Sequence, residues 1–354
     1  MKRLILAALT VALTASLFAG VAPLSPVAAS EGLADLPGYD RMDVPARHRA
    51  MPLAASVWYP AGRVTYRNTI GDSALFVGMP AYVGAAVAEG RYPLVLVSHG
   101  SGGAMDGLAW LSSRLAARGA IVLAVNHPGT TSGDSSPRRT MRLAPRAADL
   151  GAALQALLAD PQFAPHVDRD RVSALGFSLG GSTVLGLAGL RFDGDAFAGY
   201  CRKAGESSPG CDFLAKGGVR LDSLPESFSA DMRDARVSSV ISVDPGFTHA
   251  AVEESLAGVR VPVLFVNLGE EHRWPAVDVG PRGSGLAARL PGARHVAVAP
   301  AHHFTFLGVC KPGGAELLRK WEDDPICDDP EGTERARAHE EIVGIVAEFL
   351  ELAP

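Results

Sequence analysis

The residues best suited to do chemistry lie around Ser178, where an apolar run ends. Gly176, Ser178 and Gly180 form the pattern Gly-x-Ser-x-Gly, which is typical of a serine on a sharp turn between a buried strand and a helix. The backbone of such a turn is strained, and glycines on both sides of the serine prevent side-chain collisions. The turn exposes the serine hydroxyl and points the amide of Leu179 at an oxyanion forming beside it. The pattern predicts a nucleophilic serine.

A glycine cluster supplies a second group of backbone amides. Residues 93–98 are continuously apolar up to a final serine, as in a strand buried on both faces, and they lead into the run His-Gly-Ser-Gly-Gly at 99–103. Because glycines leave backbone amides free to face a ligand, the amide of Ser101 is our candidate for the second oxyanion donor. We assign His99 to holding this loop through a backbone hydrogen bond.

A serine nucleophile needs a base to take its proton and an acid to orient that base. For a serine on this kind of turn, the chain order is serine, acid, histidine. Asp244 follows an apolar strand at 237–243, and its short side chain at the strand end needs little support to fix its direction. We therefore favour Asp244 as the acid, with Glu270 and Glu271, after the next strand, as the alternative.

The base is expected after the last strand, which we place at 295–298. His302 and His303 both follow that strand, and both come after the acid in the chain. The residues by themselves leave the choice between these two histidines open.

Strands and helices alternate around these residues. Strands are expected at 120–125 and 172–176, and helices at 108–118 and 142–159. This order predicts a parallel sheet with helices on both faces, whose site lies at the carboxyl ends of the strands. The other expected elements are a hairpin of strands at 38–44 and 53–59, an irregular segment at 63–91, a strand at 261–267 and a closing helix at 334–352.

Residues 192–236 interrupt this alternation directly after the nucleophile helix. The segment shows no convincing strand, and we predict an insertion that acts as a partial lid closed by its own disulfide. Proximity in sequence favours pairing Cys201 with Cys211 and Cys310 with Cys327. The cysteine and histidine spacings do not match a metal site, and we expect no metal and no cofactor.

The N-terminus has the pattern of an export signal. Lys2 and Arg3 precede an apolar stretch at about 4–19, and small residues follow. We predict a signal peptide at 1–29, a single domain at 30–354 and a secreted or periplasmic location. The apolar stretch is short for a membrane span, so no stable anchor is expected after cleavage. The net charge of −5 argues against a nucleic-acid partner.

Four motifs together resemble a known group of proteins. The motifs are Gly-Phe-Ser-Leu-Gly-Gly at 176–181, Ser-His-Gly-Ser-Gly-Gly at 98–103, Val-Asp-Pro at 243–245 and His-Phe-Thr-Phe-Leu at 303–307. They are similar to the α/β-hydrolases known as predicted dienelactone hydrolases, which are relatives of the plasma-type platelet-activating-factor acetylhydrolases. The resemblance extends over about 38–349 and implies the α/β-hydrolase fold.

The resemblance also bears on the site residues. In this group the acid follows the strand after the insertion, which implies Asp244, and the base directly precedes a Phe-x-Phe-Leu segment, which implies His303. The cysteines at 310 and 327 also fit the group. Two features differ: the residue before the base is usually glycine and here is His302, and true dienelactone hydrolases use a cysteine where this chain has Ser178.

The residues and the resemblance together predict a serine hydrolase that cleaves small-molecule carboxylic esters through an acyl-enzyme at Ser178. An amidase or peptidase would use the same three side chains and is one alternative. A non-catalytic binding module on the same fold is the other, since a fold does not determine a function.

Overall fold

The structure is a computed structural model that describes residues 36–205, 208–271 and 273–353. The predicted signal peptide at 1–29 lies outside the described residues. The described residues fall within one compact unit that begins at Asp35. None of the helices in this described part of the chain has the length and hydrophobicity needed to cross a bilayer.

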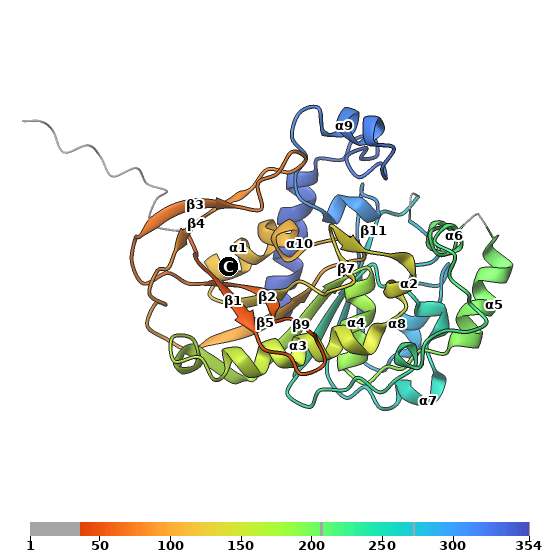
Figure 1. The fold of residues 1–354 in the computed structure, drawn as a ribbon, viewed down its shortest axis with the longest axis horizontal. Coiled ribbons are helices and arrows are strands. Elements are labelled where there is room, and N and C mark those ends of the chain that lie inside the picture. The colour runs from red at the N-terminus through yellow and green to blue at the C-terminus, as the bar shows by residue number, and fades with distance from the viewer. Residues whose placement is uncertain (1–35, 206–207, 272, 354) are drawn as a thin grey trace, which may run out of the picture. The chain divides into compact units, whose positions relative to one another are not determined.

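A ten-stranded sheet forms the centre of the described structure (Figure 1). Six neighbouring strands run parallel, and the remaining four extend the sheet on one side with mostly antiparallel pairing. In spatial order the parallel strands are β12 (Arg294–Val298), β11 (Val263–Leu268), β10 (Ser239–Val243), β9 (Val167–Phe177), β5 (Tyr92–Ser98) and β6 (Ile121–Val125). They are followed by β2 (Leu53–Tyr59), β1 (Gly38–Val44), β4 (Met79–Val83) and β3 (Tyr66–Ile70).

Helices cover both faces of this sheet, as the alternation in the sequence predicts. The longer ones are α1 (Ala109–Ala117), α3 (Leu143–Leu157), α4 (Leu179–Leu187), α5 (Gly194–Ala204), α6 (Pro209–Lys216), α9 (Gly314–Trp321) and α10 (Arg335–Phe349). The short elements include α2 (Pro137–Thr140), α7 (Glu253–Leu256), α8 (Leu286–Arg289) and a separate two-stranded ribbon of β7 (Thr130–Thr131) and β8 (Asp134–Ser135).

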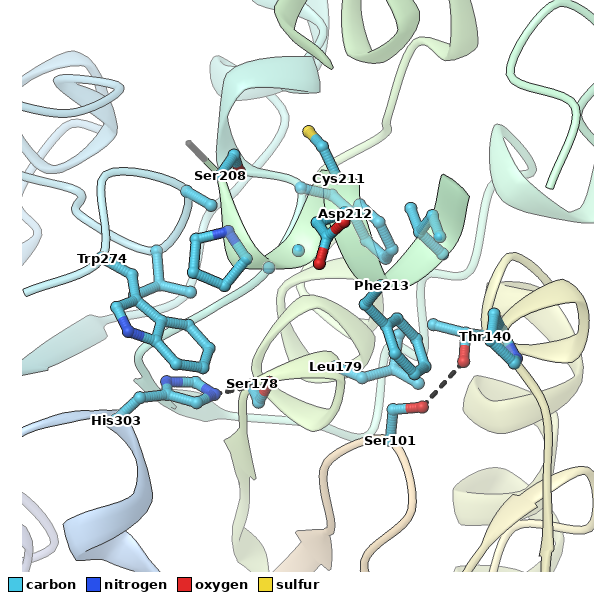
Figure 2. Close-up of a pocket in the computed structure, with 18 of the residues that line it drawn as sticks. Ser101, Thr140, Ser178, Leu179, Ser208, Cys211, Asp212, Phe213, Trp274 and His303 are labelled. Carbon is cyan, nitrogen blue, oxygen red and sulfur yellow. Dashed lines mark hydrogen bonds between the residues drawn. The ribbon is translucent and has the colours of Figure 1, made fainter. Parts of the chain in front are cut away.

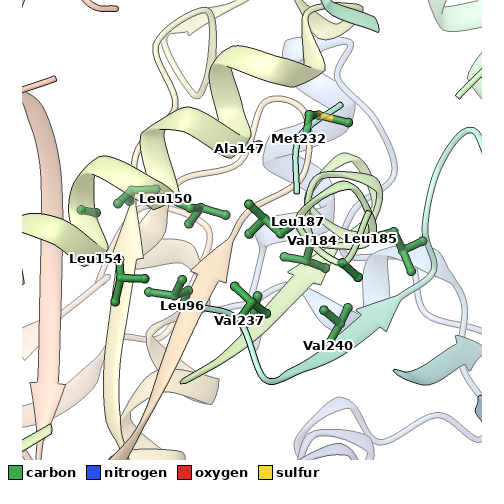
Figure 3. Packing of buried hydrophobic residues seen from close by; sticks show 14 of the residues in the cluster. Leu96, Ala147, Leu150, Leu154, Val184, Leu185, Leu187, Met232, Val237 and Val240 are labelled. Atoms are coloured by element: carbon green, nitrogen blue, oxygen red, sulfur yellow. The ribbon is translucent and has the colours of Figure 1, made fainter. Parts of the chain in front are cut away.

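Alternate residues of the central strands belong to different hydrophobic cores, because successive side chains of a strand point to opposite faces. Leu94 and Leu96 of β5 pack in one core with α3 and α4 (Figure 3). Val95 and Val97 pack in the other core with α1 and α10. Strands such as β6 and β11 are buried along their whole length, which explains why they are continuous apolar runs in the sequence.

The expectation of an irregular segment at 63–91 is wrong, because this segment contains β3 and β4. The first four residues of β3 are exposed, and β4 includes Pro80, so neither strand has the apolar pattern of a buried one. β3 pairs antiparallel with β4, and β4 pairs in parallel with β1. These residues at the edge of the sheet form strands because β1 and β4 offer backbone groups to pair with, rather than because their own sequence has a strand pattern.

The insertion at 192–236 contains helices α5 and α6, and no strand is found among its described residues. A disulfide between Cys201 and Cys211 joins the two helices. A second disulfide, between Cys310 and Cys327, closes the segment that carries α9. Both pairings are those expected from proximity in sequence.

Candidate active site

Ser178 lies on the sharp turn that joins β9 to α4. Its backbone φ of 56° is in the left-handed region, which non-glycine residues rarely adopt. A methyl group placed on Gly176 would lie 2.0 Å from the carbonyl oxygen of Gly180, and one on Gly180 would lie 1.9 Å from that of Ser98. Gly176 is therefore required for the first turn of α4 to pack against the end of β9, and Gly180 for that turn to pass beside β5. The strained turn leaves the Ser178 side chain facing a cavity.

A chain of hydrogen bonds links Ser178, His303 and Asp244. The Oγ of Ser178 lies 3.1 Å from Nε2 of His303, and Nδ1 of His303 lies 3.0 Å from Oδ2 of Asp244 (Figure 2 shows the first of these contacts). The carboxylate can only accept, so Nδ1 donates to it and Nε2 is left to accept the hydroxyl proton. This tautomer is the one that a general base for serine requires.

The carboxylate of Asp244 is fully buried and held from its other side. Its Oδ1 accepts hydrogen bonds from Nδ2 of Asn267 at 2.8 Å and from the amide of Leu268 at 2.9 Å. The Oδ1 of Asn267 in turn accepts from Nε2 of His295 at 3.0 Å. Sequence analysis did not identify Asn267, although a polar residue near the carboxyl end of the apolar strand β11 was a usable signal.

Two aromatic rings enclose the imidazole of His303. The ring of Trp274 stacks on it with centroids 4.5 Å apart, and the ring of Phe177 lies 4.7 Å away. Together with the bond to Asp244, these rings define the plane in which Nε2 reaches Ser178. Trp274 was also not identified from the sequence, because its loop carries no motif that points to the site.

The alternative acid and base residues lie apart from this chain of hydrogen bonds. His302 precedes His303, but its Nε2 faces the carboxylate of Asp329 at 3.4 Å. Glu270 and Glu271 are exposed on the loop after β11. Of the residues considered from sequence, the structure thus brings Ser178, His303 and Asp244 together.

The two proposed oxyanion donors flank Ser178. Leu179 is the first residue of α4, and a methyl group on Gly100 would lie 3.2 Å from Cβ of Ser178, so the glycine loop passes directly beside the serine. Within the described residues, no hydrogen-bond partner is found for the amides of Ser101 and Leu179. The Ser101 hydroxyl bonds to that of Thr140 at 2.7 Å (Figure 2).

His99 holds the glycine loop, as its position at a strand end suggests. Its Nδ1 donates to the carbonyl of Gly100 at 2.7 Å, and its Nε2 accepts from the amide of His127 at 3.2 Å. Burial, together with the positive charge of Arg146, lowers the pKa of His99 well below its usual value. The ring is therefore neutral and serves as a structural link.

A second Ser–His–Asp hydrogen-bond chain lies in the core, beneath the glycine loop. The Oγ of Ser98 lies 2.9 Å from Nε2 of His127, and Nδ1 of His127 lies 2.9 Å from Oδ2 of Asp149. All three side chains are fully buried. The buried guanidinium of Arg146 donates to Ser98 and to the carbonyl of His99. Ser98 begins the motif at 98–103, but no motif links it to His127 or Asp149.

Two cavities meet at Ser178 and His303. The first, which we call the aromatic cavity, has a volume of about 700 Å³ and lies beneath α5 and α6 (Figure 2). The second, which we call the polar cavity, has a volume of about 1120 Å³ and runs along the glycine loop towards β3 and α9. A molecule bound at Ser178 can therefore extend in two directions.

Sequence comparison finds partial similarity to two proteins of Thermobifida alba. The chain is 33% identical to "Cutinase est2" and 32% identical to "Cutinase est1", in each case over 104 residues. These residues make up 29% of this chain, which spans about a third (32%) of the length of either relative. The chain matches no model of a known protein family.

Structural comparison extends over nearly the whole chain. A ferulic acid esterase from Streptomyces cinnamoneus matches with a TM-score of 0.56 and 20% identity, over 92% of this chain and 92% of that one. A dienelactone hydrolase from Anabaena variabilis matches 90% of this chain and 99% of its own, with a TM-score of 0.48 and 14% identity. With the mostly parallel sheet and the helices on both faces, the structural likeness shows that this chain has the α/β-hydrolase fold.

Proposed function

We propose that this protein is an exported serine hydrolase that cleaves carboxylic esters through an acyl-enzyme at Ser178. The observation that carries the proposal is the hydrogen-bond chain from Ser178 through His303 to Asp244, which begins on a strained turn and faces two cavities. The cutinases and the ferulic acid esterase named above are, by their names, esterases, which supports the same reaction class.

In the first half of the reaction, Ser178 attacks the ester carbonyl while Nε2 of His303 takes the hydroxyl proton. The negative charge that develops on the carbonyl oxygen is stabilised by the amides of Ser101 and Leu179. Asp244 stabilises the imidazolium and holds its tautomer. The bond to the alcohol then breaks, the alcohol leaves with the proton of His303, and the acyl group remains on Ser178.

In the second half, a water molecule takes the place of the alcohol. His303 accepts a proton from the water, whose oxygen attacks the acyl carbonyl. When the bond between the acyl carbon and Oγ of Ser178 breaks, His303 returns the proton to the serine. The products are a carboxylic acid and the free enzyme. The residues described here carry out this sequence of steps without an added group.

The location and the role of the insertion belong to the same proposal. The signal peptide at 1–29 would direct the domain at 30–354 to a secreted or periplasmic location, and two disulfides favour an oxidising compartment. Helix α6 of the insertion at 192–236 lines the aromatic cavity, which supports its role as a partial lid. We also propose, from the four sequence motifs, that this protein is related to the plasma-type platelet-activating-factor acetylhydrolases.

Labelling with a fluorophosphonate probe tests the proposal. The mature protein should form a covalent adduct at Ser178, located by peptide mass spectrometry, and the Ser178→Ala variant should form none. Absence of an adduct in the wild-type protein would favour a binding module. Paired aryl esters and anilides of one acid then separate the two reaction classes, because faster cleavage of the anilide would indicate an amidase or peptidase.

A further inference from the structure

The two cavities that meet at Ser178 differ in the chemistry of their walls. The aromatic cavity is lined mainly by apolar side chains from both helices of the insertion and from the loops after β10, β11 and β12, including Phe197, Tyr200, Phe213, Phe247, Trp274 and Phe304. The charged side chains of Asp212, Lys216 and Asp324 also border it. The polar cavity has a mixed lining, in which apolar side chains such as Phe76, Leu307 and Trp321 stand beside Asn68 and a group of charged side chains, Asp40, Arg41, Asp72, Asp106 and Asp323. The polar cavity thus has the larger share of charged groups, and a substrate that spans both cavities is expected to have its more apolar end in the aromatic cavity.

Two side chains of the aromatic cavity are placed to contact a ligand. Trp274 has one face on the imidazole of His303, and Phe213 is 40% exposed, which is unusual for a phenylalanine. Figure 2 shows these two rings on opposite sides of the space above Ser178. An apolar group bonded to Ser178 would cover both rings and remove their surface from water.

The order of the two half-reactions assigns the cavities to the two ends of the substrate. After the first half, the alcohol must leave and water must reach the acyl carbon beside His303, while the acyl group stays bonded to Ser178. The cavity that holds the alcohol therefore has to admit water, which the charged side chains of the polar cavity favour and an aromatic wall opposes.

We propose that the aromatic cavity is the acyl site, and that the substrates are esters of apolar carboxylic acids much larger than acetic acid, with the alcohol in the polar cavity. This inference rests on the proposed ester hydrolysis at Ser178. An acetyl group would leave most of a cavity of about 700 Å³ unfilled and its aromatic rings uncovered. A hexanoyl or cinnamoyl group is large enough to contact Phe213 and Trp274.

The first test is a series of p-nitrophenyl esters with one leaving group and acyl chains from acetate to octanoate. Burial of each methylene should raise kcat/KM about fourfold until the cavity is filled, so hexanoate, with four more methylenes, should exceed acetate by about 250-fold. An acetate ester cleaved as fast as the hexanoate ester would overturn the assignment of the acyl group.

Three tryptophan substitutions locate the acyl group. Ala276 lines the aromatic cavity and Ala74 lines the polar cavity, whereas Ala215 is exposed on α6 outside both. Ala276→Trp should lower kcat/KM for hexanoate at least tenfold while acetate changes less than threefold. Ala74→Trp should preserve the acyl-chain preference and instead change the dependence on the alcohol, and Ala215→Trp should change neither. If Ala74→Trp rather than Ala276→Trp removes the preference for hexanoate, the two cavities are assigned the wrong way round.

A variant that enlarges the cavity provides a second route if Ala276→Trp does not fold. Phe213→Ala should reduce the hexanoate-to-acetate ratio several-fold by removing one of the rings that the acyl group covers. An unchanged ratio would contradict contact between Phe213 and the acyl group. Fluorophosphonate labelling distinguishes failure of this inference from failure of the proposed function. A labelled enzyme without an acyl preference refutes the assignment of the acyl site alone. An unlabelled protein refutes both the proposed ester hydrolysis and the acyl site.

Discussion

Two Ser–His–Asp chains lie close together in this molecule, and their hydrogen bonds have nearly the same lengths. In the first, Ser178, His303 and Asp244 are joined at 3.1 and 3.0 Å. In the second, Ser98, His127 and Asp149 are joined at 2.9 Å in both contacts. By hydrogen-bond distances alone, the buried chain is the better formed of the two, so such distances do not identify a catalytic site.

The surroundings of the two serines are what differ. Ser178 has a left-handed backbone, borders two cavities and stands beside two amides for which the described part of the chain provides no hydrogen-bond partner. Ser98 ends the extended strand β5, is fully buried and accepts a hydrogen bond from Nη2 of Arg146 at 3.1 Å. A nucleophile needs space for a carbonyl carbon and donors for an oxyanion, and only Ser178 of these two serines has both.

The buried chain has a structural task that explains its polar groups. Arg146 donates to Ser98 and to the carbonyl of His99, and Asp149 accepts from His127 and from Arg49. Burial by itself would raise the pKa of Asp149, but the bonds from His127 and Arg49 lower it to about 2, so the carboxylate is charged and satisfied. The network supports the loop that carries Ser101, the proposed oxyanion donor.

The largest expected difference between the two chains is in the effect of removing each serine. Ser178→Ala should lower the turnover of an aryl ester about 10⁶-fold and leave the melting temperature nearly unchanged. Ser98→Ala should keep turnover within a few-fold but reduce the free energy of unfolding by about 1–3 kcal/mol, because His127 and Arg146 lose a buried partner. Steady-state kinetics and urea unfolding of both variants measure this. If Ser98→Ala lost turnover at unchanged stability, the distinction between a catalytic Ser178 and a structural Ser98 would be wrong.

The two aspartates provide the next contrast. Asp244→Asn should reduce kcat about 10⁴-fold, because the amide can no longer hold His303 in the tautomer that accepts the serine proton. Asp149→Asn should instead destabilise the fold by about 3–5 kcal/mol, because the charges of Arg49 and Arg146 lose their buried counterion. Circular dichroism melts and kinetics per folded molecule separate these effects. Equal losses of stability in the two variants would show that Asp244 also has mainly a structural role.

Sequence patterns identified the hydrogen-bond chain at Ser178 but not the buried one at Ser98, for a physical reason. Ser178 lies in a local motif, and the chain order of this fold indicates where Asp244 and His303 should follow. The buried chain joins residues on β5, the loop after β6 and helix α3. Ser98 begins the motif at 98–103, but nothing in the sequence indicates that His127 and Asp149 are its partners. Its members are brought together only by the packing of the sheet and helices.

The same limit applies to the rest of the site and to the sheet edge. The residue types alone do not decide between His302 and His303, because the choice depends on where adjacent side chains point at the start of a short 3₁₀ turn at His303–Phe306. Only the resemblance of the motif at 303–307 implied His303. Trp274 acts by stacking on a residue distant in the chain. The strands β3 and β4 form because β1 offers an edge, whereas the central strands are apolar enough to be recognised alone.

A substitution of Asn267 tests how far catalysis at Ser178 depends on the hydrogen bonds that hold the carboxylate of Asp244. Asn267→Ala removes one of two bonds to Oδ1 of Asp244 and should lower kcat about 10- to 100-fold, through misorientation of the carboxylate. A matched control is Asn126, which follows the strand β6 and whose Oδ1 accepts from the amide of Met105 at 2.8 Å. Asn126→Ala should cost stability but change kcat less than threefold. The pH dependence of kcat should shift only in Asn267→Ala, and equal kcat losses in both variants would contradict a specific positioning role.

The smallest expected effect concerns the pH dependence of stability and belongs to the buried chain. Burial and the charge of Arg146 lower the pKa of His127 to about 4, whereas an unfolded histidine titrates near 6.5. Between these values the unfolded chain binds a proton that the folded chain does not, so the free energy of unfolding falls as the pH falls. From pH 6.5 to 5.5, His127 should contribute a loss of about 1 kcal/mol.

The His127→Gln variant isolates this contribution from those of the other buried histidines. The variant should be less stable than the wild-type protein at pH 7, because Ser98 and Asp149 each lose one of their buried partners. Its stability should nevertheless fall about 1 kcal/mol less between pH 6.5 and 5.5, as urea unfolding at both pH values can measure. A variant with the wild-type pH slope would mean that His127 is not held neutral in the fold. The buried chain would then contain an imidazolium between a carboxylate and a serine.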